Sequence, residues 1–288
     1  MPRRNSDNTQ AWSASRSTLL ATCRRAFYLE VTARADAHKA AHQIPLRTVV
    51  GSAVHAAIAD QMARWGAREP ISRADAEASA RTFISDIWRV KEMRITECLN
   101  GIELADERHQ EMQSAARHQL RNFFRMIWPQ FSDHSYVEHE YRDNFLLNGA
   151  SVSVQIDLAT RDPDNNFVIS DWKTGWLGHR EPEAFQMSVY ELWAHLRYHI
   201  SVSKIRTLVV NLRTGQIVRG TPSEDLLAET SERIRSESLQ LGQLHKPAAF
   251  PTSPELQKCI ACRYMGQCPD GKRAVALQRA FVAQSESA

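Results

Sequence analysis

An acidic and a basic side chain end an apolar run in the stretch FVISDWKTG, residues 167–175. The run predicts a strand, in which Asp171 and Lys173 point to the same face about 7 Å apart. A turn-forming cluster, DPDNN at 162–166, predicts a hairpin that brings Asp157 of the preceding strand beside Asp171. Adjacent carboxylates repel each other unless a cation lies between them, and Mg²⁺ accepts such oxygens together with water and phosphate. The hairpin therefore predicts a metal-dependent hydrolytic site in which Lys173 orients or deprotonates water; the alternative is a surface hairpin with a salt bridge.

Three further side chains have groups suited to such a site. Gln186 and Tyr190 are four residues apart in a predicted helix, so both cover one face and could hold a phosphate or a base edge. His55 lies next to Val54 on another predicted helix and could bind the same metal or the substrate phosphate. The alternative is purely structural: a half-buried tyrosine and a partly buried histidine.

The cysteines are distributed unevenly. Cys259, Cys262 and Cys268 form the pattern Cys-x2-Cys-x5-Cys, and a thiol group this tight indicates a metal rather than a disulfide framework. An iron–sulfur cubane needs a fourth ligand, for which Cys23 is the best candidate. Four thiolates could equally bind zinc, although zinc ribbons usually use two Cys-x2-Cys pairs. Cys98 has no partner pattern and is expected to be inert.

Composition sets broad limits on the function. The 288 residues, 43% of them hydrophobic, suffice for one large domain or two small ones. A formal net charge of +3 permits an anionic partner without requiring one. No stretch approaches the roughly 20 apolar residues of a membrane span, and the first ten residues lack the apolar segment of a secretory signal. We therefore expect no membrane association and a cytoplasmic location.

Periodicity predicts the elements that must position these side chains. The expected helices are 15–32, 51–65, 72–96, 103–128, 183–200 and 223–244. The expected strands are 151–158, 167–173, 205–212 and 216–219. The first strand is expected to direct four apolar side chains to one face: Val152, Val154, Ile156 and Leu158. Residues 1–14 and 274–288 are expected to form a disordered N-terminus and a tail, and the order of elements predicts an α/β or α+β core with added helices.

Taken in chain order, these segments resemble the PD-(D/E)xK nuclease superfamily, and specifically its RecB-like branch with an iron–sulfur cluster. That branch includes CRISPR-associated RecB-like exonucleases and the nuclease domains of AddAB-type helicase–nucleases. The matching segments are STLLATCRRAFYLE, GSAVHAAI, VQID, VISDWKTG, QMSVY and CIACRYMGQC, which span about residues 15–270. Residues 67–130 match least, and Val154 stands where the family usually has glycine.

The resemblance implies an α/β fold with a restriction-endonuclease-like core, that is, a short mixed central sheet flanked by helices. It implies one nuclease domain over residues 15–273. Within this domain, residues 67–130 would be a helical insertion, and residues 255–270 would form the cysteine cluster loop that closes with Cys23.

The resemblance also implies roles for individual residues. The implied ligands of Mg²⁺ or Mn²⁺ are three side chains and one backbone carbonyl: His55, Asp157, Asp171 and the carbonyl of Trp172. Lys173 would position or activate the attacking water, and Gln186 and Tyr190 would contact DNA. A glutamate upstream, either Glu138 or Glu140, would support the site.

The implied iron–sulfur site is a 4Fe–4S cluster with four ligands: Cys23, Cys259, Cys262 and Cys268. The implied activity is a metal-dependent DNA nuclease, expected to be an exonuclease that favours single-stranded DNA, in repair, recombination, CRISPR or phage defence. No G-x-x-x-x-G-K-[ST] motif occurs, so a helicase or other subunit would be a separate protein. The alternatives are a non-cleaving iron–sulfur subunit for DNA binding or assembly, and a zinc-stapled restriction-type endonuclease.

Overall fold

The computed structural model describes residues 11–32, 46–89, 106–175, 180–241, 243, 246–260, 262 and 264–285. Several predictions fall outside these ranges: those for Cys98, for the helix ends at 90–96 and 103–105, and for residues 1–10 and 286–288. Within the described ranges, no helix combines the length and the apolar character that crossing a lipid bilayer requires.

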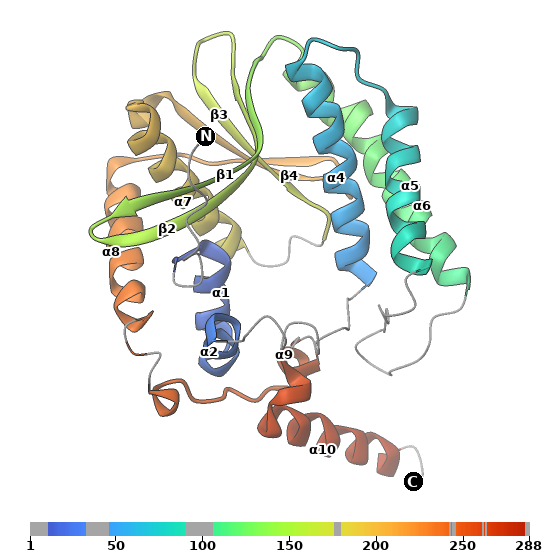
Figure 1. The fold of residues 1–288 in the computed structure, drawn as a ribbon, viewed down its shortest axis with the longest axis vertical. Helices are drawn as coiled ribbons and strands as arrows, with labels where there is room; N and C mark the ends of the chain where they lie inside the picture. The colour runs from blue at the N-terminus through green and yellow to red at the C-terminus, as the bar shows by residue number, and fades with distance from the viewer. Residues whose placement is uncertain are drawn as a thin grey trace.

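A five-stranded mixed sheet forms the centre of the fold, in the order β1-β2-β3-β4-β5 (Figure 1). Its strands are β1 (Ser135–Leu147), β2 (Ala150–Arg161), β3 (Phe167–Lys173), β4 (Ile205–Asn211) and β5 (Gln216–Arg219). Neighbours are antiparallel except β3 and β4, which are parallel and joined through α7 (Arg180–Tyr198), the crossover that a parallel pair needs. The predicted α/β architecture with a short mixed sheet is confirmed, and β1 is a strand that the sequence did not assign.

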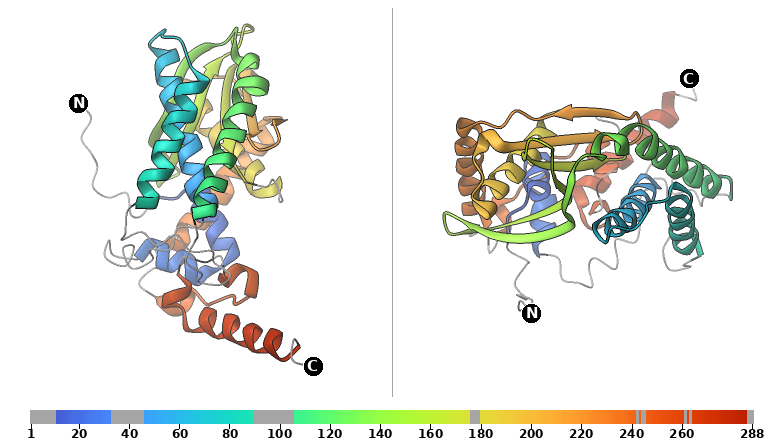
Figure 2. Two further views of the ribbon diagram at one scale, coloured as in Figure 1. Left: turned by 90° about the vertical axis from the view of Figure 1, so that its right-hand side faces the viewer. Right: turned by 90° about the horizontal axis from the view of Figure 1, so that it is seen from above.

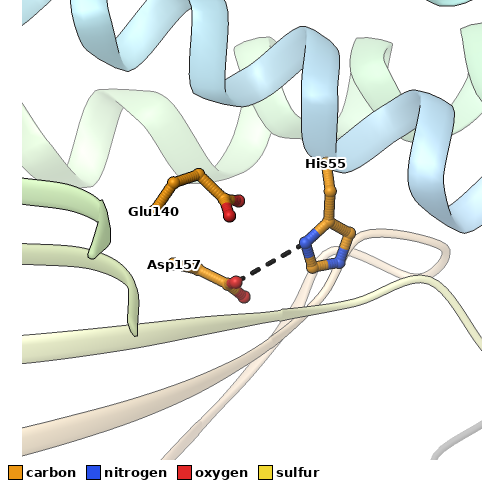
Figure 3. A group of neighbouring side chains, drawn as sticks. All are labelled: His55, Glu140 and Asp157. Carbon is orange, nitrogen blue, oxygen red and sulfur yellow. Dashed lines mark ion pairs between the residues drawn. The ribbon is translucent and has the colours of Figure 1, made fainter. Parts of the chain in front are cut away.

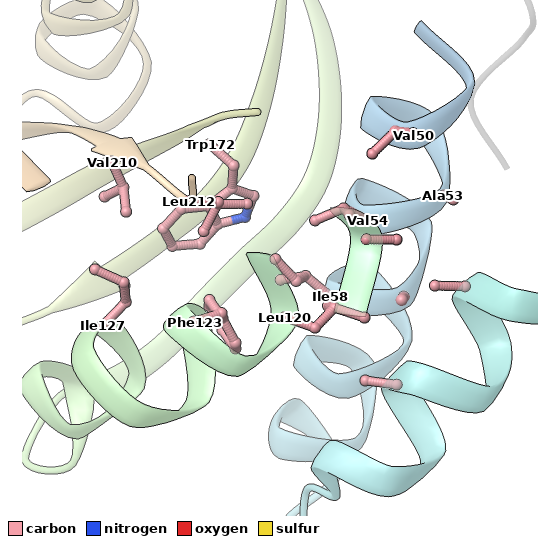
Figure 4. Packing of buried hydrophobic residues seen from close by; sticks show 14 of the residues in the cluster. Val50, Ala53, Val54, Ile58, Leu120, Phe123, Ile127, Trp172, Val210 and Leu212 are labelled. Carbon is pink, nitrogen blue, oxygen red and sulfur yellow. The ribbon is translucent and has the colours of Figure 1, made fainter. Parts of the chain in front are cut away.

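Helices cover both faces of the sheet (Figure 2). On one face, α7 and α8 (Glu224–Leu241) bury an apolar cluster that includes Trp193 and Ile234. The other face carries α4 (Leu46–Gly66), α5 (Arg73–Arg89), α6 (Asp106–Asn122), the π-helical turn η1 (Phe123–Ile127) and the 3-10 turn η2 (Trp128–Phe131). There Phe123 packs edge-on against Trp172 of β3, with ring centroids 5.6 Å apart (Figure 4). The helices α5 and α6 and the turn η1 fall within the segment 67–130, and together with α4 they form the layer on this face.

The single helix predicted for 15–32 is wrong, because the chain breaks at Cys23. Two helices result, α1 (Ala14–Thr22) and α2 (Arg24–Thr32), with Cys23 in an extended conformation at φ −160° and ψ 112°. Tertiary contacts hold the break: the backbone N–H of Arg25 donates to Pro251 O, and Phe27 stacks on Phe250. Local periodicity cannot reveal a break that is held by residues more than 200 positions away.

The predictions for the chain ends are partly wrong. Ala11 and Trp12 are buried, and Trp12 pairs with Val152 of β2 while its indole N–H donates to Glu237 at 2.9 Å. Trp12 can pair with Val152 because β3 pairs with β2 only from Leu158 to Arg161, which leaves the edge of β2 open at Val152. At the other end, α10 (Pro269–Ser285) extends through most of the predicted tail. The remaining elements are η3 (Val202–Lys204), η4 (Pro247–Ala249), α9 (Leu256–Ile260) and η5 (Met265–Gln267).

The alternation predicted for β2 ends at Asp157. Three of the four apolar side chains lie in the cluster under α7: Val152, Val154 and Ile156. Leu158 instead lies in the cluster under α4, so its predicted direction is wrong. Opposite this point on β1, Glu140 adopts a positive φ of 44° between the paired residues His139 and Tyr141. This conformation disrupts the pairing of β1 with β2. Asp157 lies opposite, at the point where the alternation of side chains along β2 reverses.

Candidate active site

The two carboxylates of the hairpin lie side by side, as predicted. Leu158 pairs with Ser170, and the next step of this antiparallel register places Asp157 beside Asp171. The Oδ2 atom of Asp157 accepts the backbone N–H of Trp172 at 2.7 Å, which ties β2 to β3. Asp157 is 7% exposed and Asp171 is 4% exposed, so both are charged groups held inside the fold.

Three side chains from three elements converge beside this hairpin (Figure 3). His55 of α4, Glu140 of β1 and Asp157 of β2 each offer a ligand atom, and these atoms all lie within 4.8 Å of one another. The Nδ1 atom of His55 is 3.5 Å from Oδ1 of Asp157. Of the two glutamates left open by the sequence, Glu140 is the one in this group. Glu138 pairs with Ala159, beyond the reversal.

Close packing of α4 against the end of β3 brings His55 to this position. A Cβ atom at Gly51 would lie 2.8 Å from the Oγ1 atom of Thr174, which is closer than packed atoms normally approach. Glycine therefore permits the contact, one helical turn before His55. The apolar side of the same helix, with Val54 and Ile58 fully buried, fixes its rotation against the sheet.

A chain of polar contacts links the second carboxylate to α7. The Nζ atom of Lys173 lies 2.7 Å from Asp171 Oδ2 and also donates to Gln186 Oε1 at 2.7 Å. The amide of Gln186 donates to Asp171 Oδ1 at 3.1 Å and to the hydroxyl of Tyr190 at 2.6 Å. That hydroxyl donates in turn to Gln155 O at 2.6 Å. The i, i+4 spacing predicted to bring Gln186 and Tyr190 to one face thus places both at the site, where Gln186 holds Lys173 and Asp171 and Tyr190 holds Gln186.

Electrostatics at the site favour a bound cation. Burial raises the pKa of Asp171 to about 6, an effect that the charge of Lys173 opposes and the charge of Asp157 reinforces. Burial lowers the pKa of His55, but the hydrogen bond and charge of Asp157 outweigh it, so the net shift is upward. The raised pKa of Asp171 shows that its charged form is costly to bury, and a bound cation would offset that cost. A donor set of carboxylates and one imidazole fits Mg²⁺ or Mn²⁺.

Two side-chain amides donate hydrogen bonds to the backbone just after Lys173. The sequence gave no reason to select either residue. Gln119 of α6 donates to Thr174 O at 3.3 Å, and Asn211 of β4 donates to Gly175 O at 3.3 Å. A cavity of about 570 Å³ is lined by six of the site residues: His55, Asp157, Asp171, Lys173, Gln186 and Tyr190. The ring of Trp172 lies in the buried cluster that includes Phe123, Leu120 and Val54 (Figure 4).

The four cysteines predicted to act together also converge. They line one cavity of about 810 Å³: Cys23, Cys259, Cys262 and Cys268. Burial raises the pKa of the Cys262 thiol, and the other three thiols raise it further. A Cβ atom at Gly271 would lie 3.5 Å from Cys268 Sγ and 3.7 Å from Cys259 Sγ, so small size at this position leaves room beside the sulfurs. All four are free cysteines.

Comparison with known proteins identifies the family. The family model of the PD-(D/E)XK nuclease superfamily matches residues 11–269. The chain belongs to this superfamily. Members of the PD-(D/E)XK superfamily are mostly nucleases and typically use Mg²⁺ or Mn²⁺, which indicates a metal-dependent nuclease acting on DNA. The predicted resemblance is thus confirmed at the superfamily level.

Two further comparisons add little. No curated protein matches the chain. Among solved structures, the chain is similar to one titled "Crystal structure of SSO0001", with 12% identity over 57% of this chain and 75% of that chain. The TM-score is 0.31, which is too low to carry an argument about fold or function.

Proposed function

We propose that this protein is a magnesium- or manganese-dependent deoxyribonuclease of the RecB-like branch, and that it acts as an exonuclease on single-stranded DNA. One observation carries the proposal: ligand atoms of His55, Glu140 and Asp157 lie within 4.8 Å of one another, beside an Asp171–Lys173 ion pair. The proposed setting is DNA repair, recombination, CRISPR or phage defence in the cytoplasm, with any helicase or other subunit supplied separately.

The resemblance implies four metal ligands, to which we add Glu140. The proposed set is therefore His55, Glu140, Asp157, Asp171 and the backbone carbonyl of Trp172. A bound divalent cation would polarise a phosphoryl oxygen and lower the pKa of a bound water. The protein contributes a fixed, largely buried set of oxygens: Asp157 is held by the N–H of Trp172, and Asp171 by Gln186. Residues held in this way need little reorganisation when charge develops on the phosphate.

Lys173 is proposed to position or activate the attacking water. An ammonium has three N–H donors, and the contacts of Lys173 with Asp171 and Gln186 account for two of them. The third is left for a water or a phosphoryl oxygen in the cavity. Gln186 and Tyr190 are also proposed to contact DNA, since both line the cavity.

The four cysteines are proposed to hold a 4Fe–4S cluster that joins the chain ends. Their convergence on one cavity supports a shared group, and four free, half-buried thiols suit thiolate ligation. Tetrahedral zinc with bonds of about 2.3 Å needs sulfurs about 3.8 Å apart. Among the described residues, no three cysteine sulfurs lie within 4.8 Å of one another, which favours the larger cluster over zinc. Iron and labile sulfide in anaerobically purified protein would support this assignment, whereas stoichiometric zinc would overturn it.

The nuclease proposal is tested with end-labelled linear single strands, linear duplexes and circular DNA in Mg²⁺ or Mn²⁺. Wild type is expected to degrade linear single strands and spare circles. Asp171→Ala should lower the rate by at least about 10²-fold. The matched control is Asp164→Ala, which removes a carboxylate from the exposed turn between the same two strands.

Each result is decisive for one part of the proposal. If circles are cut as readily as linear strands, the exonuclease assignment is wrong. If Asp171→Ala cuts as wild type does, the active-site assignment is wrong. A wild-type protein that binds DNA with no cleavage under any of these conditions would establish the non-cleaving subunit instead.

A further inference from the structure

The active-site cavity continues away from the carboxylates. It shares four lining residues with the cysteine cavity: Ser13, Ser15, Ser153 and Gln155. The two cavities therefore form one trough that runs from Lys173 to the four cysteines. Residues at the N-terminal end of α1 and in β2 line the shared section, and the pairing of Trp12 with Val152 holds these two segments together.

The polar face of β2 lines this trough. Ser153, Gln155 and Asp157 alternate along the strand, so successive members lie about 7 Å apart and lead away from the metal ligands. Arg142 on β1 is the cross-strand partner of Gln155, and directly paired residues project from the same face. Arg142 is therefore two residues along β1 from Glu140 of the candidate metal site.

Positive charge dominates the section beyond the active site. Its lining includes four cationic residues and one carboxylate: Arg16, Arg25, Arg142, Lys258 and Glu30. Lys258 forms an ion pair with Glu255, whereas Arg142 is exposed and, within the described part of the chain, makes no ion pair or side-chain hydrogen bond. The charge of Arg142 is thus available to a ligand in the trough.

Among the described residues that line the cysteine section of the trough, none has an exposed aromatic ring on which a base could stack. Tyr264 is the one aromatic residue among its described lining residues, and this side chain is 2% exposed. Proteins that bind single strands through their bases stack them on exposed aromatic rings, whereas a basic groove follows the backbone. Serine, threonine and arginine side chains, which line this section, are typical contacts of phosphate oxygens.

We infer that the trough is a second nucleic-acid subsite, which binds the sugar–phosphate backbone of a single strand with Arg142 as its first phosphate contact beyond the active site. The inference rests on the proposed nuclease function and extends it to a binding mode. Recognition through phosphates makes the subsite indifferent to base sequence and sensitive to salt. Arg16 and Arg25 continue the path toward the cysteines.

The test measures binding of a fluorescein-labelled 20-nucleotide oligothymidylate by fluorescence anisotropy, in EDTA, from 0.05 to 0.5 M salt. Each phosphate contact to a single strand contributes about −0.7 to the slope of log K against log salt. Arg142→Ala should make the slope shallower by about 0.7, so the loss of affinity relative to wild type should be about 5-fold larger at 0.05 M than at 0.5 M salt. Arg142→Lys, which keeps the charge, should retain the wild-type slope.

Arg219→Ala is the matched control, since Arg219 is also an exposed arginine but lies on β5, at the other edge of the sheet. If Arg142→Ala changes the slope no more than Arg219→Ala does, the subsite is wrong. Equal binding of the 20-mer and its duplex would overturn the single-strand assignment. Because EDTA prevents cleavage, the outcome does not depend on catalysis. Asp171→Ala that still cleaves would overturn the active site alone, and unchanged binding by Arg142→Ala would overturn the subsite alone.

Discussion

The active-site end and the cysteine end of the trough differ in how much apolar packing holds their side chains. At the active-site end, β2 and β3 lie between two extensive buried clusters, one formed with α4 and the other with α7. At the cysteine end, the buried cluster consists of Leu20, Phe27 and Phe250, with a few half-buried neighbours. From this comparison we propose that apolar packing preforms the candidate active site, whereas the cysteine end needs the proposed metal group for its order.

The largest effect is expected at the preformed end, on activity and not on stability. Lys173→Gln removes the charge that faces Asp171 and the donor assigned to water, so cleavage should fall by about 10³-fold. The midpoint of thermal unfolding should change little, because the neighbouring helices and strands remain packed. Lys204→Gln, at an exposed position, is the control. A Lys173→Gln protein with a lowered thermal midpoint and near wild-type cleavage would contradict this prediction.

The next largest effect is expected at the cysteine end, on stability. Cys262→Ser should release the cluster and lower the free energy of unfolding by about 3–4 kcal/mol, the contribution of a ligand held at 100 to 1,000 times its dissociation constant. Iron content, labile sulfide and the thermal midpoint provide the measurements. Cys98→Ser should leave all three unchanged. If both variants retain iron and stability, the cysteine end does not depend on a bound group.

A buried glutamate makes the stability of the active-site layer sensitive to pH. Burial raises the pKa of Glu191 to about 7, against which the hydrogen bond from Thr207 acts, and the side chain is 1% exposed. A raised carboxyl pKa stabilises the fold below the unfolded value of 4.5, and this stability is lost as pH rises through 7. Wild type should therefore lose up to about 3 kcal/mol between pH 4.5 and 8 through this group.

Urea unfolding of wild type and Glu191→Gln at pH 5 and pH 8 checks this sign. Glutamine keeps an oxygen for Thr207 and cannot ionise, so the variant should gain stability relative to wild type at pH 8 and not at pH 5. A difference between the two proteins that is the same at both pH values would exclude Glu191 as the titrating group.

The smallest effect concerns the contact that brings α4 to the site. Gly51→Ala improves helix propensity by about 1 kcal/mol, but its Cβ atom would displace Thr174 beside Lys173. We expect kcat to fall about 10-fold with little loss of stability, since small displacements of catalytic groups are costly. Thr174→Ala removes the opposing atom, so the double variant should recover part of this loss. Ser52→Ala, exposed on the same helix, is the control.

Local patterns in the sequence predicted the hairpin and much of the site. Alternation and a turn cluster placed Asp157 beside Asp171, and helical spacing placed Gln186 and Tyr190 together, because these relations depend only on the geometry of one or two elements. The order of elements was likewise sufficient for the α/β class.

Features set by tertiary contacts were not predictable in this way. Glu138 and Glu140 have the same alternation parity, and the positive φ of Glu140 and the reversal of β2 determine which one joins the site. The break at Cys23 depends on contacts with Pro251 and Phe250. The role of Gln119 arises from a backbone carbonyl on a distant strand end, a relation that no pattern in its own helix reveals.

The central claim is that the convergent carboxylates and His55 bind the divalent cation required for cleavage. Titration of wild type and Asp157→Asn with Mn²⁺, with cleavage of an end-labelled single strand measured on the same samples, tests it most directly. Asparagine keeps an acceptor for the N–H of Trp172, so the fold should persist. The account predicts that Mn²⁺ affinity falls by more than about 10-fold and that cleavage falls with it. Wild-type Mn²⁺ affinity and wild-type cleavage in Asp157→Asn would contradict it.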